Sequence, residues 1–351
     1  MKVLVRADSS VDIGSGHLMR CLTLADQLCI EGAEVVFVCR DLPGAMFDLL
    51  QARGYRNAKL PFADVANLSQ SIDVKETLEA AAILFPDGFD WLVVDHYALD
   101  AAWESVLRSA SKKIMVIDDL ANRKHDCDLL LDQNYYRDLE QRYKGLVPEH
   151  CITLLGPEYV LLRPEFADAR EQLRERDGKI RRILLFLGGS DPSNITGKIL
   201  AVLIQPPFSD IAIDVVVGVS NPHKSVIQNL CSKMKNTRYH CQVSNMAELI
   251  GNADMAIGAG GATTWERCVL GLPSLTLVFA DNQLQTTIDL HDRGAIRYLG
   301  WADRITPSDI ERSIDLFINN SSLVSNLSKK ALLIMNDWCG GQAVVAEMFK
   351  K

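Results

Sequence analysis

The sequence lacks any long apolar run, and this absence excludes one class of protein at once. No stretch approaches the roughly 20 consecutive apolar residues that a membrane-spanning helix needs, so we expect no transmembrane segment. The N-terminus carries charge at Arg6 and Asp8, where a signal peptide needs an apolar centre. The nine cysteines form no C-x-x-C pair, and Cys21, Cys29 and Cys39 lie in apolar periodic segments, which predicts small buried side chains. We therefore expect a reducing, cytoplasmic setting.

Positive charge is also scarce. The 351 residues include 37 Lys and Arg against 45 Asp and Glu, which gives a net charge of −8. Such a protein is not expected to bind nucleic acid or an anionic membrane through a general electrostatic field. A few local groups would then have to meet the charge of any anionic ligand. The length predicts about two domains.

Short β-rich runs alternate with amphipathic stretches along the whole chain, and this alternation predicts an α/β fold. Apolar residues recur at helical spacing over residues 18–30, which predicts a helix there. The expected strands of the first half are 2–6, 34–39, 91–95, 113–117, 129–131 and 151–155, and those of the second half are 183–187, 211–217, 239–243, 255–257 and 274–278.

A polar, charge-dense stretch at 163–182 separates the two series of strands, and residues 167–176 within it predict an exposed helix. We expect two Rossmann-like domains, 1–165 and 178–331, each with its ligand site at the carboxyl ends of its strands. Two such domains facing each other would leave a cleft, which is a common place for a small-molecule site.

The segment 8–17 follows the first expected strand and begins a helix. Gly14, Ser15 and Gly16 would let the backbone approach a bulky ligand and offer helix N–H groups to an anion. The third glycine of a dinucleotide fingerprint is missing. His17 falls in the first helical turn, where the helix dipole disfavours imidazolium, so a neutral nitrogen can act as a general base. A simple turn with a packing histidine is the alternative.

A second glycine-rich turn, at 258–261, precedes another expected helix. Its N–H groups and the hydroxyls that follow could hold a diphosphate, and Glu266 could accept hydrogen bonds from a ribose diol. The alternative is a tight structural turn with Glu266 in solvent. No Walker A sequence is present, so the P-loop NTPase mechanism is not supported. The candidate binding residues here are Gly260, Gly261, Ala262, Thr263, Thr264 and Glu266.

Carboxylates follow two expected strands of the first half. Asp95 and Asp118 could orient a histidine, bind sugar hydroxyls or cap helices. Asp126 and Asp128 match the D-x-D pattern that holds a divalent metal in many glycosyltransferases, but the adjoining apolar run at 129–131 favours the start of a buried strand. The histidines have no zinc-site spacing. We expect neither a metal site nor a cofactor.

Two further turns end strands of the second half. Glycines and a proline in 187–194 indicate a sharp turn, in which Ser190 or Ser193 could cap the next helix. Asn282 and Gln283 follow the strand 274–278, and their amides suit neutral sugar hydroxyls or acetamido groups.

Six segments form a specific combination: RADSSVDIGSGHLMRCL (6–22), IDDLANR (117–123), CDLLLDQN (127–134), LGPEYVLLRPEF (155–166), LGGSDP (187–192) and the turn region 258–273. Together they resemble the UDP-2,4-diacetamido-2,4,6-trideoxy-β-L-altropyranose hydrolases of the pseudaminic acid pathway. The second half is also similar to the UDP-binding domain of the peptidoglycan N-acetylglucosaminyltransferases, whose glycine turn and glutamate correspond to 258–266.

This resemblance implies a GT-B fold, in which two Rossmann-like domains face each other across a cleft, the second holds UDP and residues 332–351 return to the first. It implies an enzyme that hydrolyses the UDP-linked diacetamido sugar at the anomeric carbon, with inversion and without a metal, and that supplies the free sugar for pseudaminic acid synthesis. It also implies that His17 is the base. The expected partner is this substrate alone, with no nucleic acid or membrane, and the expected oligomeric state is a monomer.

Two alternatives stay open, one of them an enzyme and the other from a different class. One is a GT-B glycosyltransferase that uses a UDP-amino sugar, for which a membrane-facing patch at 42–50 with Arg53 and Arg56 is a candidate. The other is a non-catalytic UDP-sugar-binding subunit, which would bind UDP without turnover.

Overall fold

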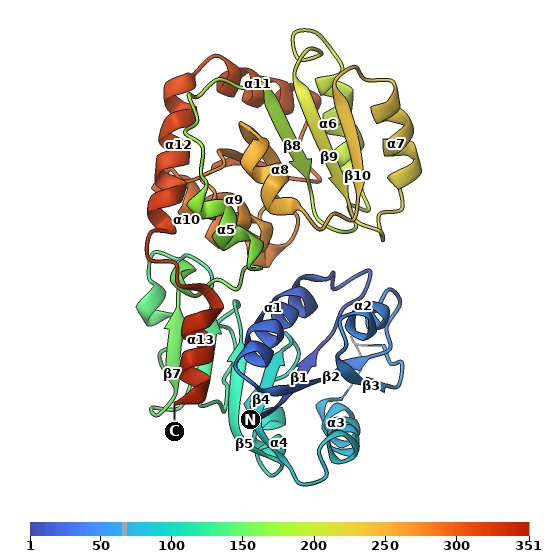
Figure 1. Ribbon diagram of the computed structural model, residues 1–351, viewed down its shortest axis with the longest axis vertical. Coiled ribbons are helices and arrows are strands. Elements are labelled where there is room, and N and C mark those ends of the chain that lie inside the picture. Colours follow the sequence, from blue (N-terminus) through green and yellow to red (C-terminus); the bar gives the residue numbers. More distant parts are fainter. Residues whose placement is uncertain (65–68, 351) are drawn as a thin grey trace. The chain divides into compact units, whose positions relative to one another are not determined.

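The computed structural model describes residues 1–64 and 69–350, and the chain divides into two compact units (Figure 1). Unit 1 comprises Met1–Leu161 together with Cys339–Lys351, and unit 2 is Leu162–Trp338. The C-terminal segment enters unit 1 at Cys339 rather than at Leu332, because Leu332 still belongs to helix α12 (Ser321–Ile334) and packs against Gly271 of unit 2.

Within the described part of unit 1, seven parallel strands form one sheet in the order β3-β2-β1-β4-β5-β6-β7. The strand order reverses between β1 and β4: the strand that follows β1 in the chain lies on one side of this pair, and the strand that follows β4 lies on the other side. In open α/β sheets, ligands bind where the order reverses, at the carboxyl ends of the strands. The strands are β1 (Lys2–Ala7), β2 (Glu34–Arg40), β3 (Arg56–Leu60), β4 (Phe89–Asp95), β5 (Ser111–Ile117), β6 (Leu129–Asp132) and β7 (Ile152–Leu155).

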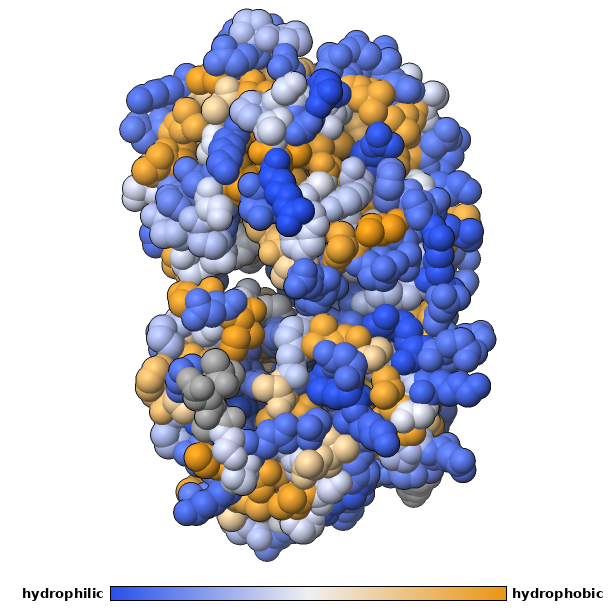
Figure 2. Space-filling view, turned by 180° about the vertical axis from the view of Figure 1, so that it is seen from behind, coloured by the Kyte–Doolittle hydropathy of each residue, from blue (hydrophilic) through white to orange (hydrophobic). Residues whose placement is uncertain are grey.

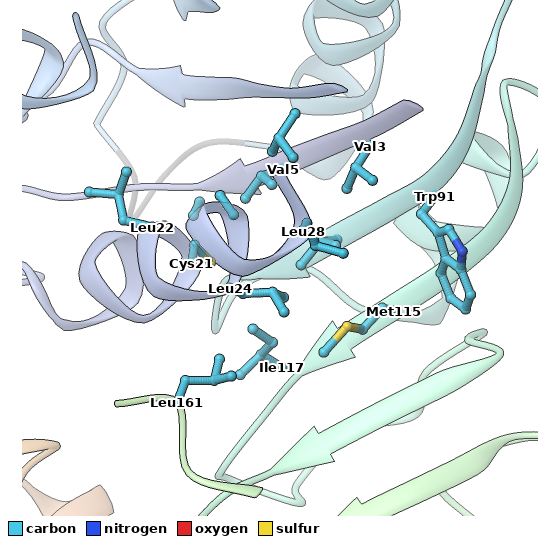
Figure 3. Close-up of a cluster of buried hydrophobic side chains, with 14 of the residues drawn as sticks. Val3, Val5, Cys21, Leu22, Leu24, Leu28, Trp91, Met115, Ile117 and Leu161 are labelled. Atoms are coloured by element: carbon cyan, nitrogen blue, oxygen red, sulfur yellow. The ribbon is translucent and has the colours of Figure 1, made fainter. Parts of the chain in front are cut away.

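Helices cover both faces of this sheet. Leu24 and Leu28 of helix α1 point toward Val5 and Met115 of the strands below, and Figure 3 shows this cluster of buried side chains. Helix α13 packs on α1, and Trp91 Nε1 donates to the carbonyl of Met348 at 3.0 Å. The helices of unit 1 are α1 (Gly16–Ile30), α2 (Phe47–Ala52), α3 (Gln70–Leu84), α4 (Ala101–Leu107) and α13 (Gly340–Phe349), with 3₁₀ turns at Leu139–Gln141 and Pro157–Tyr159.

Unit 2, which is described throughout, holds a parallel sheet in the order β10-β9-β8-β11-β12-β13. Its order reverses between β8 and β11. The strands are β8 (Arg182–Phe186), β9 (Ala212–Val217), β10 (Thr237–Cys241), β11 (Met255–Ala259), β12 (Ser274–Val278) and β13 (Arg297–Trp301). The helices are α5 (Glu165–Glu171), α6 (Ile195–Leu203), α7 (Lys224–Ser232), α8 (Met246–Asn252), α9 (Thr263–Val269), α10 (Asp281–Arg293), α11 (Pro307–Ile318) and α12.

Two expectations about local structure are wrong, and two strands were missed. Helix α5 ends at Glu171 instead of continuing to 176, because Arg176 is buried and donates to carbonyls at the ends of α8 and α9, including Ile250 and Leu270. The edge strands β3 and β13 were not expected, since neither has a buried apolar pattern. Cys29 is exposed, whereas Cys21 and Cys39 are buried as expected.

The surface supports no membrane-facing patch at 42–50. Leu42, Phe47 and Leu50 are buried in unit 1. Arg53 and Arg56 form ion pairs with acidic neighbours on the surface. On the face shown in Figure 2, apolar side chains form small areas separated by polar ones. Among the described residues, no helix is both long and apolar enough to cross a membrane.

A fully buried charge network lies beside the reversal point of unit 1. Asp73 of α3 accepts hydrogen bonds from the guanidinium groups of Arg6 and Arg40 at 2.8 and 2.7 Å, and from Trp103 Nε1 at 3.1 Å. Burial acts to raise the pKa of Asp73, but the two guanidinium groups outweigh it and hold this pKa at about 2.

We expect Asp73→Asn to lower the free energy of unfolding of the protein at pH 7 by about 3 kcal/mol, since it removes the buried carboxylate that Arg6 and Arg40 share. The loss lies at the lower end for a broken buried ion pair, because Arg6 keeps Asp8 and Arg40 keeps Glu76 as partners. The pKa of Asp73 is depressed on folding, so its stabilisation is fully present above the unfolded value of about 4 and is lost as the pH falls toward 2. Denaturant unfolding at several pH values would measure this. A stability difference that stays constant from pH 7 to pH 2.5 would contradict the assignment.

Candidate active site

The reversal point of unit 1 brings His17 of α1 against Asp95, the last residue of β4. His17 Nδ1 lies 2.5 Å from Asp95 Oδ1, and both side chains are buried. Arg20 Nη2 also approaches Nδ1, but at 3.3 Å it is farther away than the carboxylate oxygen. Because a carboxylate only accepts hydrogen bonds, we assign the proton to Nδ1 and a lone pair to Nε2 in the neutral ring. The pair therefore has the arrangement of a general base and the carboxylate that orients it.

Arg20 completes this pair. It lies three residues after His17 on the same face of α1, and its Nε and Nη2 donate to the two oxygens of Asp95 at 2.5 and 2.7 Å. Burial acts to raise the pKa of Asp95, but Arg20 and His17 hold it well below its ordinary range. Asp95 is therefore ionised at neutral pH.

Tyr97 borders the imidazole on another side. The two rings meet edge to face with centroids 4.5 Å apart, and the Tyr97 hydroxyl hydrogen-bonds to Asp119. Burial, with the charge of Asp119, raises the pKa of Tyr97 well above its ordinary value, so this hydroxyl stays protonated. Arg20 Nη1 reaches Asp119 Oδ2 at 3.2 Å. Asp119 thus anchors two of the groups that surround His17.

A second Asp–His pair mirrors the first across the same two strands. Asp8, directly after β1, lies 3.2 Å from Nε2 of His96, which follows β4. The other nitrogen of His96 accepts from the N–H of Ala98 at 3.1 Å, so both nitrogens are engaged. Each strand thus ends in an aspartate that holds a histidine from the other strand's loop. His96 connects the loops that follow β1 and β4. Because both of its nitrogens are engaged, His17 is the better candidate of the two histidines for proton transfer.

The loop before α1 places Gly14 and Gly16 as the sequence predicts, next to His17. Gly14 adopts a φ of 81° and closes a tight turn with Ser10 through two backbone hydrogen bonds, which explains the glycine. A side chain at Gly16 would meet open space. Ser15 precedes α1 and makes no cap hydrogen bond with any described residue, so the N–H groups of the first turn are not capped by it.

The other aspartates predicted for unit 1 lie elsewhere. Asp118 does not orient His17, because it pairs with Arg123 at 2.7 Å. Asp126 and Asp128 both pair with Arg108 at 2.9 Å and precede β6, so they lie at the amino ends of the strands, opposite His17. Within residues 1–64 and 69–350, no group of three His, Cys, Asp or Glu side chains could hold a metal ion.

The glycine turn of unit 2 lies at its reversal point, directly after β11. A side chain at Gly260 would come 2.5 Å from Thr287 Oγ1, so the residue must be small for α10 to pack here. A Cβ atom at Gly261 would lie 3.7 Å from Gln283 Nε2, which is an ordinary contact distance. Gln283 Oε1 accepts from the N–H of Phe279 at 3.0 Å, and Asn282 lies beside it on α10. The turn and the predicted amide pair are therefore neighbours.

Arg267 is a feature of this turn that the sequence reading missed. Its guanidinium is buried against neutral acceptors, donating to the Thr263 and Thr264 hydroxyls at 3.1 Å each and to the Ala259 carbonyl at 2.9 Å. Burial lowers the pKa of Arg267 to about 10, so it remains charged at neutral pH. A side chain at Gly258 would come 2.5 Å from this guanidinium, which explains the first glycine of the turn.

The two threonine hydroxyls differ in what they can do. Thr264 Oγ1 accepts from Arg267 and also donates to the Ala259 carbonyl at 3.3 Å, so both its functions are used inside the unit. Thr263 Oγ1 accepts from Arg267 and keeps its own proton to donate. Of the predicted pair, Thr263 is the better donor toward a ligand.

Glu266 is largely buried, with 16 % of its side chain exposed, and Arg163 Nη2 lies 3.4 Å from its Oε1. Burial raises the pKa of Glu266, and Arg163 opposes this. Glu266, Thr263 and Arg267 line a small hollow whose other walls are apolar residues of β8, β11 and α8. Ala262, at the start of α9, is exposed beside it.

The turn at 187–194 has a structural role. Asp191, and not Ser190 or Ser193, caps α6 by accepting from the N–H groups of Ile195 and Thr196 at 2.9 Å each. Asn194 caps the N–H of Gly197 as well. The carboxylate is the better cap because its two oxygens satisfy two N–H groups at once.

Comparison with known proteins agrees with this architecture. MurG of Acinetobacter baumannii superposes over 100 % of this chain and 99 % of its own, with a TM-score of 0.67 at 16 % identity. The chain has a GT-B fold. Residues 183–337 of this GT-B protein match the glycosyltransferase family 28 C-terminal domain, which places that domain in unit 2.

Two relatives are similar in sequence. UDP-2,4-diacetamido-2,4,6-trideoxy-beta-L-altropyranose hydrolase of Campylobacter jejuni is 29 % identical over 295 residues, covering 84 % of this chain and 97 % of the relative. The spore coat polysaccharide biosynthesis protein SpsG of Bacillus subtilis is 31 % identical over 175 residues, about half of each chain. The first similarity extends over both units.

Proposed function

We propose that this GT-B protein is a nucleotide-sugar enzyme that hydrolyses a UDP-linked 2,4-diacetamido-trideoxy sugar at the anomeric carbon with inversion. The observation that carries the proposal is the His17–Asp95 pair, a buried base with a fixed tautomer at the reversal point of a Rossmann-like sheet. The similarity to the Campylobacter jejuni hydrolase over 84 % of the chain supports the substrate class.

Unit 1 would supply the base in this reaction. His17 Nε2 takes a proton from a water molecule, and the water oxygen forms a bond to the anomeric carbon while the bond to the UDP oxygen breaks. The bonding electrons leave with UDP. A single displacement of this kind inverts the configuration at the anomeric carbon. The products are the free sugar, UDP and a proton held by His17.

Unit 2 would bind the nucleotide. We assign the diphosphate to the backbone N–H groups of residues 261–262 and the Thr263 hydroxyl, next to the buried charge of Arg267. The N–H of Gly260 is not part of this set, because it donates to the Leu277 carbonyl at 2.9 Å. Glu266 would accept hydrogen bonds from the ribose, and the amides of Asn282 and Gln283 would contact the acetamido sugar. No step in this scheme uses a metal or a cofactor, and Asp126 and Asp128 are engaged by Arg108.

The reaction can be tested by incubating the protein with the UDP-linked diacetamido sugar, EDTA and no acceptor, followed by NMR. Free sugar that appears first as the inverted anomer is the expected result. The match to glycosyltransferase family 28 makes transfer to an acceptor the second candidate. Turnover only after an acceptor is added would establish that alternative, tight UDP binding without any turnover would indicate a binding subunit, and loss of activity with EDTA would contradict the metal-independent scheme.

Glu266→Ala is expected to weaken UDP binding about 10- to 100-fold, because hydrogen bonds to a charged group contribute about 1.5–3 kcal/mol. Isothermal titration calorimetry with UDP would measure this. Glu311→Ala, on the exposed side of α11, is the matched control and should bind UDP as the unsubstituted protein does. Equal UDP affinity in the two variants would contradict the ribose assignment.

A further inference from the structure

Asp119 has no role in the scheme above, yet it is connected to His17 through Arg20 and Asp95. Arg20 lies between two carboxylates, with Nη1 on Asp119 and with Nε and Nη2 on Asp95. Asp95 in turn holds His17. The Oδ1 atom of Asp119 is buried and accepts no hydrogen bond from any described residue, so its charge is only partly compensated.

The charges of this cluster explain why the second carboxylate matters. Arg20 contributes one positive charge, and Asp95 and Asp119 contribute two negative charges. With a neutral imidazole the sum is −1, and with an imidazolium it is zero. If Asp119 were neutral, Arg20 would cancel Asp95, and proton uptake by His17 would create an uncompensated buried cation. Charges held out of water interact strongly, so this difference is large enough to affect the base.

We propose that Asp119 is a positioning residue that acts through Arg20: it supplies the negative charge that stabilises the His17 imidazolium formed during hydrolysis. This inference rests on the proposed role of His17 as the base. Asp119 also fixes Tyr97 against the imidazole, so it holds the ring in place from two sides. The backbone around Asp119 is rigid, because Tyr136 and Arg142 both donate to its carbonyl, at 3.0 and 2.9 Å.

The other charged groups around the site are directed elsewhere. Cys21 of α1 donates to Asp95 at 3.6 Å, and its thiol pKa is raised well above the ordinary value by burial. His96, after β4, faces Asp8. Asp118, after β5, faces Arg123. Asp132, at the end of β6, pairs with Arg142, and burial raises its pKa to about 7. Arg20 therefore has two carboxylate partners among the described residues, Asp95 and Asp119.

The test compares Asp119→Asn with Asp119→Glu in the full-length protein. The first variant removes the charge and keeps the shape, and the second keeps the charge. Asp118→Asn is the matched control, because it makes the same charge change one residue away at a carboxylate that faces Arg123. Thermal unfolding would establish that each variant is folded. The readouts are the pH dependence of kcat/KM and the NMR titration of the His17 imidazole, assigned with a His17→Gln variant.

For Asp119→Asn we expect the His17 titration and the acid limb of the kcat/KM profile to move to lower pH by about 0.5 to 1 unit, which corresponds to a three- to tenfold change in the protonation equilibrium. Loss of a negative charge disfavours imidazolium, which fixes this direction. Asp119→Glu and Asp118→Asn should keep the original midpoint. An unchanged midpoint in folded Asp119→Asn, or an equal shift in Asp118→Asn, would overturn the proposal. The NMR titration does not need turnover, so failure of the proposed hydrolysis would be seen separately as an absence of product.

Discussion

Turnover is expected to fall by about 10²- to 10⁴-fold when His17 is replaced by alanine, which is the usual contribution of a general base. UDP affinity should stay within a few-fold, because the groups assigned to UDP are all in unit 2. Initial rates of sugar release and calorimetry with UDP would measure the two quantities on one protein sample.

The control for this substitution is His150→Ala. His150 is 61 % exposed and lies near Asp128, before β7 and away from the carboxyl ends of the strands. The His150→Ala substitution removes an imidazole as His17→Ala does, but leaves the proposed base in place. A His17→Ala protein with a near-normal rate would refute the assignment of the base, and a loss of UDP binding in the same variant would contradict the division of roles between the units.

Asp95→Asn is expected to reduce kcat by about 10²- to 10⁴-fold as well, for a different reason. An asparagine amide can donate to Nδ1, which would move the imidazole proton to Nε2 and remove the lone pair that accepts a proton from water. The change also leaves buried Arg20 with less compensation, so we expect a loss of about 3–5 kcal/mol in the free energy of unfolding.

Two measurements separate these effects of Asp95→Asn. Nitrogen NMR of the histidine ring would report the tautomer of His17, and denaturant unfolding would report the stability. Asp126→Asn, which removes a carboxylate at the opposite edge of the same sheet, is the matched control and should keep both the tautomer and the rate. An Asp95→Asn protein that is folded, retains Nδ1–H and turns over normally would contradict the role of Asp95.

Most of the fold could be predicted from the sequence because its central strands are buried on both faces. Such strands appear as short, continuous apolar runs, and β12 lies where it was predicted, at 274–278. The edge strand β3 carries three polar residues, and Arg297 and Gly300 interrupt the apolar residues of β13, so no continuous apolar run indicated either strand. The end of α5 could not be predicted either, because Arg176 is drawn out of a helix by carbonyls from residues more than seventy positions away.

The candidate site was predictable only in part, for a related reason. A histidine after a glycine loop is a local signal, and so is the glycine turn followed by Glu266. The partners of these residues come from distant segments: Asp95 is separated from His17 by 78 positions and Arg163 from Glu266 by 103. Sequence reasoning left Asp95 and Asp118 as equal candidates, and the structure distinguishes them by their partners. The position of Arg20 beside His17 could have been predicted, since the two residues are three positions apart and lie on one face of the same helix.

The return of α13 to unit 1 has a consequence for how the protein is made. The ribosome delivers residues in chain order, and domains begin to fold as they emerge. The whole of unit 2 is synthesised before Trp91 and α1 receive the helix that covers them. Synthesis of unit 1 therefore begins before that of unit 2 and continues after it, and the apolar face of unit 1 stays uncovered until α13 has been made.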